Sequence, residues 1–156
     1  MMEDISLSLN ERVILFLEGV GEDHAGRTID FVLDQDDEWM EKTCDYIQWL
    51  FPLDDETRQA EFVPVLKNAE IDRIRESKLA RENLIKAASR MRRFWGKGHW
   101  IKELDHNHLR ITRTIKSLRL LVSDEEADKM KIWLSSVLGP NNKIINQKSI
   151  QFWREA

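Results

Sequence analysis

Cysteine is nearly absent from this chain of 156 residues, because Cys44 is the only one. A single cysteine excludes an intrachain disulfide and a zinc site built from several thiolates. The first residues, MMEDISLSLN, contain Glu3 and Asp4 and lack the basic start and apolar run of a secretory signal. The longest uncharged run, residues 132–142, is much shorter than the roughly 18 apolar residues of a membrane span. We therefore expect a soluble, cytoplasmic protein without membrane insertion.

Proline and glycine are also scarce, with three and six residues, and they fall between stretches in which apolar residues recur at helical spacing. Hydrophobic residues make up 42% of the chain, which is enough for a core. At this length we expect residues 1–156 to form a single compact, all-α globular domain of six to seven helices. The expected helices are 10–18, one capped by Asp23 and ending at Leu33, 38–50 after Asp36 or Asp37, 68–95, 106–122, one from Ser123 to Gly139, and 146–155.

Charge is unevenly distributed along the chain. Residues 1–61 contain 4 basic and 17 acidic residues, a net charge of −13, whereas residues 86–119 contain 10 basic and 2 acidic residues, a net charge of +8. Such a separation indicates either a surface for an anionic partner or an acidic half that packs beside the basic half.

The stretch DHNHLRITRTIKSLRLL, residues 105–121, predicts a helix with Asn107 or Asp105 accepting hydrogen bonds at its start. Its apolar residues share one face, which we assign to the core: Ile111, Ile115, Leu118 and Val122. Its basic residues are three positions apart and form an inclined ridge, which we expect on the solvent side: Arg110, Arg113, Lys116 and Arg119.

Two more specific functions are open to this region, namely metal binding and nucleic-acid binding. His99, His106 and His108 are available as ligands, but the two histidines of H-x-H at a helix start diverge, and we predict no metal site. The neighbouring RMRRFWGKGHW, residues 90–100, mixes basic and aromatic side chains as nucleic-acid-binding surfaces do. This alternative function uses the 86–119 segment, with Arg90, Arg92, Arg93, Lys97, Lys116 and Arg119 as its contact residues.

Catalytic motifs have only weak counterparts in the chain. GEDHAGRT, residues 21–28, matches a phosphate loop with Arg27 in place of lysine, but it follows a helix-like segment, and Glu22 and Asp23 would repel phosphate. No serine lies in a nucleophile-elbow pattern, and Cys44 lies in an apparent helix among acidic neighbours. We therefore predict a protein that is not an enzyme, with no catalytic residues and no cofactor.

Two motifs carry a resemblance to a known family. CDYIQWLFPL, residues 44–53, and HNHLRITRTIKSLRLL, residues 106–121, resemble the conserved domain of the opioid growth factor receptor family, and more loosely so do residues 26–41 and 149–156. The chain looks like a compact, single-domain member of the bacterial type. The resemblance implies binding of a peptide, because animal members are associated with an enkephalin-type ligand. Cys44 departs from the family pattern, which usually has histidine there.

DYIQWLFP has two interpretations: the end of a core helix, with Tyr46 and Leu50 packed inward, or one wall of a binding groove. In the second, the arginines of the 106–121 motif engage a carboxylate or an aromatic side chain, and replacing Arg110 and Arg113 with alanine weakens binding with little change in melting temperature. The predicted function is thus recognition of a peptide or protein by a helical domain. The predicted ligand-binding residues are Gln48, Trp49, His106, Asn107, Arg110 and Arg113.

Overall fold

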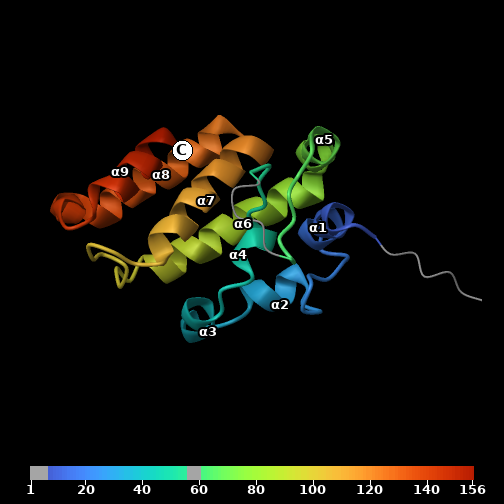
Figure 1. Cartoon of the computed structure of the whole chain (residues 1–156), viewed down its shortest axis with the longest axis horizontal. Helices are drawn as coiled ribbons and strands as arrows, with labels where there is room; N and C mark the ends of the chain where they lie inside the picture. Colours follow the sequence, from blue (N-terminus) through green and yellow to red (C-terminus); the bar gives the residue numbers. More distant parts are fainter. Residues whose placement is uncertain (1–6, 56–60) are drawn as a thin grey trace, which may run out of the picture.

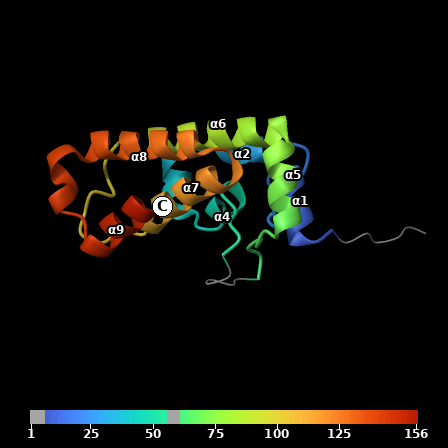
Figure 2. The same ribbon diagram turned by 90° about the horizontal axis from the view of Figure 1, so that it is seen from above.

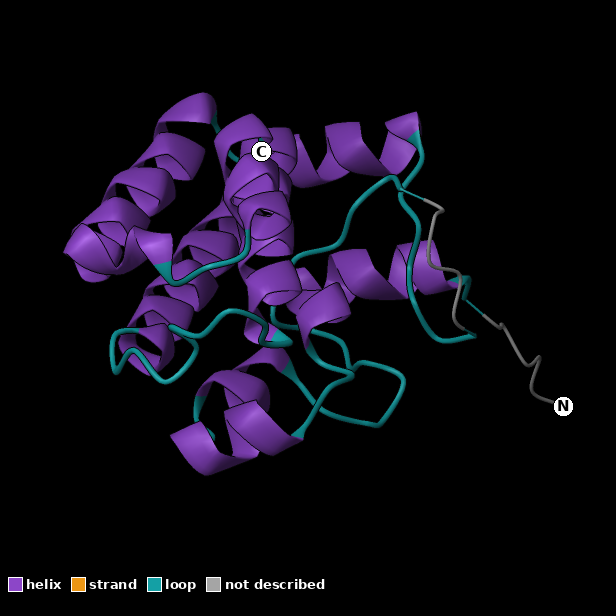
Figure 3. Cartoon of the chain, turned by 60° about the vertical axis from the view of Figure 1, so that its left-hand side comes forward, coloured by secondary structure: helices purple, strands orange, loops and turns teal. Residues whose placement is uncertain are grey.

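The computed structural model describes residues 7–55 and 61–156, and in these ranges the chain is all-α (Figure 1). Residues 1–6, which include Glu3 and Asp4 from the argument about a leader, lie outside the described residues. Figure 3 shows helices joined by loops, with no strand in the described ranges. Nine α-helices and one 3₁₀ helix are present there: α1 Leu9–Leu17, α2 Ile29–Leu33, α3 Asp37–Lys42, α4 Ile47–Leu50, α5 Asn68–Glu76, α6 Lys78–Trp95, α7 Asn107–Leu121, α8 Asp124–Leu138, η1 Gly139–Lys143 and α9 Gln147–Glu155.

The long helix α6 organises the packing. In Figure 2, α1 and α5 lie at its N-terminal end, and α8 lies beside its C-terminal half. Helix α7 packs against α8 and α9 and also contacts α5 and α6. Three tryptophans, Trp49, Trp95 and Trp100, are completely buried in this core. Within the described ranges, no helix combines the length and the apolar character that crossing a membrane requires.

The helix expected over residues 68–95 is divided at Ser77, and this part of the prediction was wrong. Ser77 has an extended backbone, and its hydroxyl accepts a hydrogen bond from the Ala80 N–H, which caps α6. The same hydroxyl donates to the Glu18 carboxylate at 2.7 Å, which holds the break against α1.

The helix expected over residues 38–50 is also divided, into α3 and α4. Asp36 caps α3 as expected, but Thr43 is extended and ends it. The break exposes backbone carbonyls that a helix would have paired, and the Arg110 guanidinium donates to two of them, Met40 O at 2.9 Å and Thr43 O at 2.8 Å. These two divisions explain why the structure has more helices than the six to seven expected.

Asp23 does not cap the second helix, which corrects another prediction. Its buried carboxylate closes a turn by accepting hydrogen bonds from the backbone N–H groups of Ala25 and Arg27, both at 2.9 Å. Thr28 caps α2 instead, because its hydroxyl accepts from the Phe31 N–H. The capping hydroxyl of Ser123 is confirmed, since it accepts from the Glu126 N–H at 3.1 Å.

Candidate functional site

Arg110, the first basic residue of the row on α7, does not lie on the solvent side as expected, and Arg113 is partly buried. Arg110 is only 8% exposed and points towards the α3–α4 break, as described above. The Arg113 Nε donates to the Phe51 carbonyl at 2.8 Å, and burial lowers the pKa of the Arg113 guanidinium to about 10. Lys116 is exposed as predicted. Arg110 therefore holds the break between α3 and α4, and Arg113 holds the residue that follows α4.

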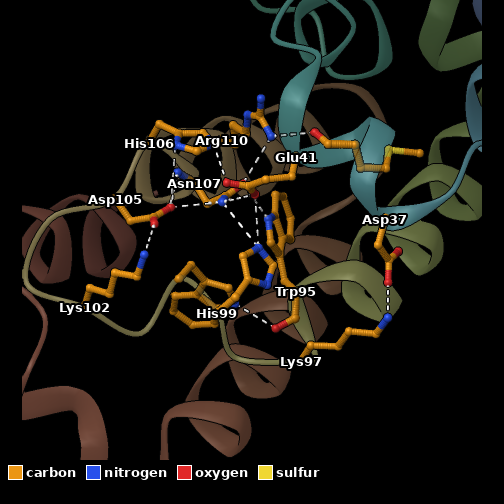
Figure 4. A network of polar contacts seen from close by, with 12 residues as sticks. Asp37, Glu41, Trp95, Lys97, His99, Lys102, Asp105, His106, Asn107 and Arg110 are labelled. Atoms are coloured by element: carbon orange, nitrogen blue, oxygen red, sulfur yellow. Dashed lines mark hydrogen bonds and ion pairs between the residues drawn. The ribbon is translucent and has the colours of Figure 1, made fainter.

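A buried polar network is centred on Asn107, the first residue of α7 (Figure 4). Its Oδ1 accepts hydrogen bonds from the Trp95 indole N–H at 3.1 Å and from Arg110 Nη1 at 3.2 Å. Its Nδ2 donates to Glu41 Oε1 at 3.0 Å and to Asp105 Oδ1 at 2.9 Å. One completely buried side chain thus joins α3, α6, α7 and the loop before α7.

The outer edge of this network consists of titratable side chains. The Glu41 carboxylate lies between two imidazoles, with His99 Nε2 at 3.2 Å from Oε1 and His106 Nε2 at 3.1 Å from Oε2. His108 does not join them, because it is buried and its Nε2 lies 2.9 Å from the Trp100 carbonyl. In residues 7–55 and 61–156, no group of three or more His, Cys, Asp or Glu side chains is arranged to hold a metal ion.

Asp105, rather than Asn107, accepts the hydrogen bond at the start of α7, from the Asn107 N–H at 2.9 Å. Burial alone raises the pKa of the Asp105 carboxyl, but hydrogen bonds from the backbone and side chain of Asn107 outweigh it, and the net pKa is lowered. A carboxyl whose pKa is lowered on folding stabilises the protein above its unfolded pKa and loses this contribution as the pH falls through the folded pKa.

We therefore expect Asp105→Asn to reduce the free energy of unfolding by about 1.5–3 kcal/mol at pH 7, the range for hydrogen bonds to a charged group. The difference between the two proteins should shrink below about pH 4, since the wild-type carboxyl is then being protonated. Urea unfolding at pH 7 and at pH 3 measures this. A difference that stays constant over that range would show that the Asp105 charge does not contribute.

The CDYIQWLFPL motif, residues 44–53, contributes to a different feature, a pocket of about 210 Å³. Gln48 lines it, while Trp49 lies in the core beneath and donates its indole N–H to the Phe62 carbonyl at 3.0 Å. The predicted ligand-binding residues are thus divided: Gln48 belongs to the pocket, and Asn107, Arg110 and His106 gather around Glu41. The lining residues of the pocket are His24, Cys44, Asp45, Gln48, Glu61, Phe62 and Val63.

His24 organises one wall of this pocket. Its ring stacks on the ring of Phe62, with 5.3 Å between centroids, and on that of Trp49, with 5.8 Å. Its Nε2 lies 3.0 Å from Asp45 Oδ2, and Arg27 Nη2 lies 3.0 Å from Asp45 Oδ1. Burial raises the pKa of the Asp45 carboxyl, but the hydrogen bonds from His24 and Arg27 prevail and lower it. Asp45 is consequently an ionised acceptor at neutral pH.

Two buried polar atoms of the pocket residues have no hydrogen-bond partner in the described part of the chain: His24 Nδ1 and Gln48 Oε1. Buried polar atoms are nearly always paired, with protein or with ordered water, so an unpaired one on a pocket residue can accept a hydrogen bond from water or from a bound group. Sequence reasoning missed His24 and Phe62, since both lie outside the helices and follow no periodicity. The only signal was the position of His24 inside the GEDHAGRT turn.

Three of the six basic residues of the nucleic-acid alternative form ion pairs with carboxylates. Arg90 Nη2 lies 3.0 Å from Asp37 Oδ1, and Lys97 forms an ion pair with the same carboxylate. Arg119 pairs with two carboxylates of α8, and Arg92 is half-buried. Two further basic residues of the set are exposed: Arg93 and Lys116. Part of the charge separation along the sequence is therefore satisfied inside the fold.

Fold and site together define an all-α protein with a buried polar network and a small pocket, both built on the segment from α3 to α4. The model of the opioid growth factor receptor (OGFr) conserved region matches residues 28–103, which confirms the resemblance over this segment. The matched segment includes the CDYIQWLFPL motif, whereas the 106–121 motif lies after it. Neither the curated proteins nor the solved structures contain a match.

Proposed function

We propose that this protein is a recognition domain that binds a peptide or protein partner in the cytoplasm, and that the pocket at Gln48 receives part of that partner. The observation that carries the proposal is a pair of buried, unpaired polar atoms on two residues that line the pocket, His24 Nδ1 and Gln48 Oε1. An unpaired buried polar atom costs roughly 1–3 kcal/mol, which a bound group with matching hydrogen bonds recovers. No catalytic step is part of this proposal.

Two further observations support it. The matched family is described as a growth factor receptor, and a receptor recognises a ligand. The pocket also combines a half-exposed aromatic ring, Phe62, with a few polar groups, which is the usual composition of a ligand site. At about 210 Å³ the pocket is below the usual size of a drug-like site, and it suits one side chain or chain terminus of a larger partner.

The exposed thiol of Cys44 gives a direct test, because it is the only cysteine and it lines the pocket. Peptides are first selected on the unmodified protein from a random display library. Alkylation of Cys44 with N-benzylmaleimide is expected to weaken their binding at least about tenfold, since the adduct occupies the pocket. Fluorescence anisotropy with labelled peptides measures the change in affinity.

The matched control is the Cys44→Ser variant, which should bind the same peptides with or without reagent treatment. If the library gives no peptide above background, or if the alkylated protein binds as tightly as the unmodified one, the proposal is wrong.

A further inference from the structure

We infer that the pocket at Gln48 binds a primary ammonium group, from the amino terminus or a lysine side chain of the partner. That the ammonium group belongs to a peptide or protein rests on the proposed function. That the pocket binds an ammonium group is argued from the geometry of the pocket alone. Three features of the pocket lead to it: the hydrogen-bonding character of its unpaired atoms, the charge of its lining, and its aromatic wall.

Both unpaired atoms are acceptors. An ionised carboxylate can only accept a hydrogen bond, so the contact of 3.0 Å between Asp45 Oδ2 and His24 Nε2 places the imidazole proton on Nε2. In the neutral ring, Nδ1 then carries a lone pair and no proton. Gln48 Oε1 is an amide oxygen and is likewise an acceptor. A ligand that satisfies both atoms must bring at least two N–H or O–H donors.

The charge of the lining selects among such donors. Among the lining residues in the described part of the chain, the two charged ones, Asp45 and Glu61, are both acidic, and none is a lysine or arginine. Arg27, which contacts Asp45, is held by Asp23 and Asp45. Arg12 donates to the Asp23 carbonyl, and its guanidinium lies 5.7 Å from the centroid of the Trp49 ring. An acidic rim above two acceptors favours a cationic donor and disfavours a carboxylate or phosphate.

The aromatic wall fits the same ligand. Phe62 is 50% exposed and stacks on His24, so one face of this pair is available at the pocket. An ammonium group close to an aromatic face is attracted by the negative potential of the ring. Its three N–H donors match the two unpaired acceptors and one carboxylate of the rim. This ligand chemistry is the reverse of the expectation from sequence, which assigned arginines to an anionic group.

The first test uses three small probes of similar shape: phenethylammonium, the neutral N-acetylphenethylamine and the anion phenylacetate. Backbone amide NMR of Cys44 and Gln48 reports their binding. We expect the ammonium probe alone to shift these resonances, and Gln48→Leu to weaken it by roughly ten- to hundredfold. Gln147→Leu is the matched control, since Gln147 is exposed on α9 and far from the motif in sequence.

The second test separates the two sources of the ammonium group. Peptides selected on the protein are compared with versions in which the amino terminus is acetylated or each lysine is replaced by norleucine. Loss of affinity on acetylation assigns the amino terminus, and loss with norleucine assigns lysine. If alkylation of Cys44 abolishes peptide binding but neither change matters, the ammonium inference is wrong and the proposed function stands. If no peptide binds, the proposed function fails, and the probe series alone decides the ammonium inference.

Discussion

Replacing Asn107 with alanine is expected to reduce the free energy of unfolding by about 3–4 kcal/mol. The asparagine makes four side-chain hydrogen bonds in a completely buried position, and its removal leaves the Trp95 indole N–H without its acceptor. Each buried donor or acceptor that loses its partner costs about 1–3 kcal/mol, and a small cavity adds to the cost. For a protein of this length the loss corresponds to a decrease in melting temperature of roughly 10 °C.

His106→Ala is the matched control for Asn107→Ala, because His106 is the preceding residue and its side chain is 54% exposed. We expect this variant to lose less than about 0.5 kcal/mol, as most surface substitutions do. Urea unfolding monitored by tryptophan fluorescence measures both proteins. Equal, small losses in the two variants would show that the Asn107 network does not hold α3 to α7.

Replacing Arg110 with methionine is expected to cost about 3 kcal/mol of stability. Methionine keeps much of the aliphatic volume but cannot donate, so the Thr43 carbonyl loses the hydrogen bond that Arg110 Nη2 makes to it. The Met40 carbonyl still accepts from the Tyr46 hydroxyl at 2.8 Å, which limits the loss. The guanidinium also lies 5.5 Å from the centroid of the Tyr46 ring, and this contact is lost as well.

The result for Arg110 decides between two roles. The sequence alone predicts that Arg110 and Arg113 bind the partner, so that replacing them leaves the melting temperature nearly unchanged. The contacts of the side chain favour the structural role, so the melting temperature should decrease by several degrees. Lys116→Met, an exposed position on the same helix, is the control and should leave the melting temperature unchanged. A stable Arg110→Met protein would restore Arg110 as a candidate for ligand contact.

The helices with a strong cap and a regular apolar stripe could be predicted from the sequence. The expected 106–122 and 146–155 segments correspond to α7 and α9 within one residue at each end. The breaks at Thr43 and Ser77 were not predictable from local pattern, because each depends on a distant partner. Arg110, 67 residues along the chain, holds the Thr43 carbonyl, and Glu18, 59 residues away, accepts from Ser77.

The candidate site was only partly accessible to the same reasoning. Gln48 was selected from the DYIQWLFP motif and does line a pocket. A helical wheel assigns charged residues to solvent and therefore places Arg110 on the solvent side. No local signal in the sequence shows that the expected helix is interrupted at residue 43, so that its backbone carbonyls accept hydrogen bonds from Arg110. His24 comes from a loop whose shape is fixed by the buried Asp23 carboxylate, so its position opposite Gln48 follows from tertiary structure alone.

The most direct test of the central claim is a titration of a selected peptide into ¹⁵N-labelled protein, followed by backbone amide chemical shifts. The account predicts that the largest changes map to His24, residues 44–48 and residues 61–63, the residues that form the pocket. Changes concentrated at Arg92, Arg93 and Lys116, with the pocket unaffected, would contradict it and return the binding surface to the basic segment.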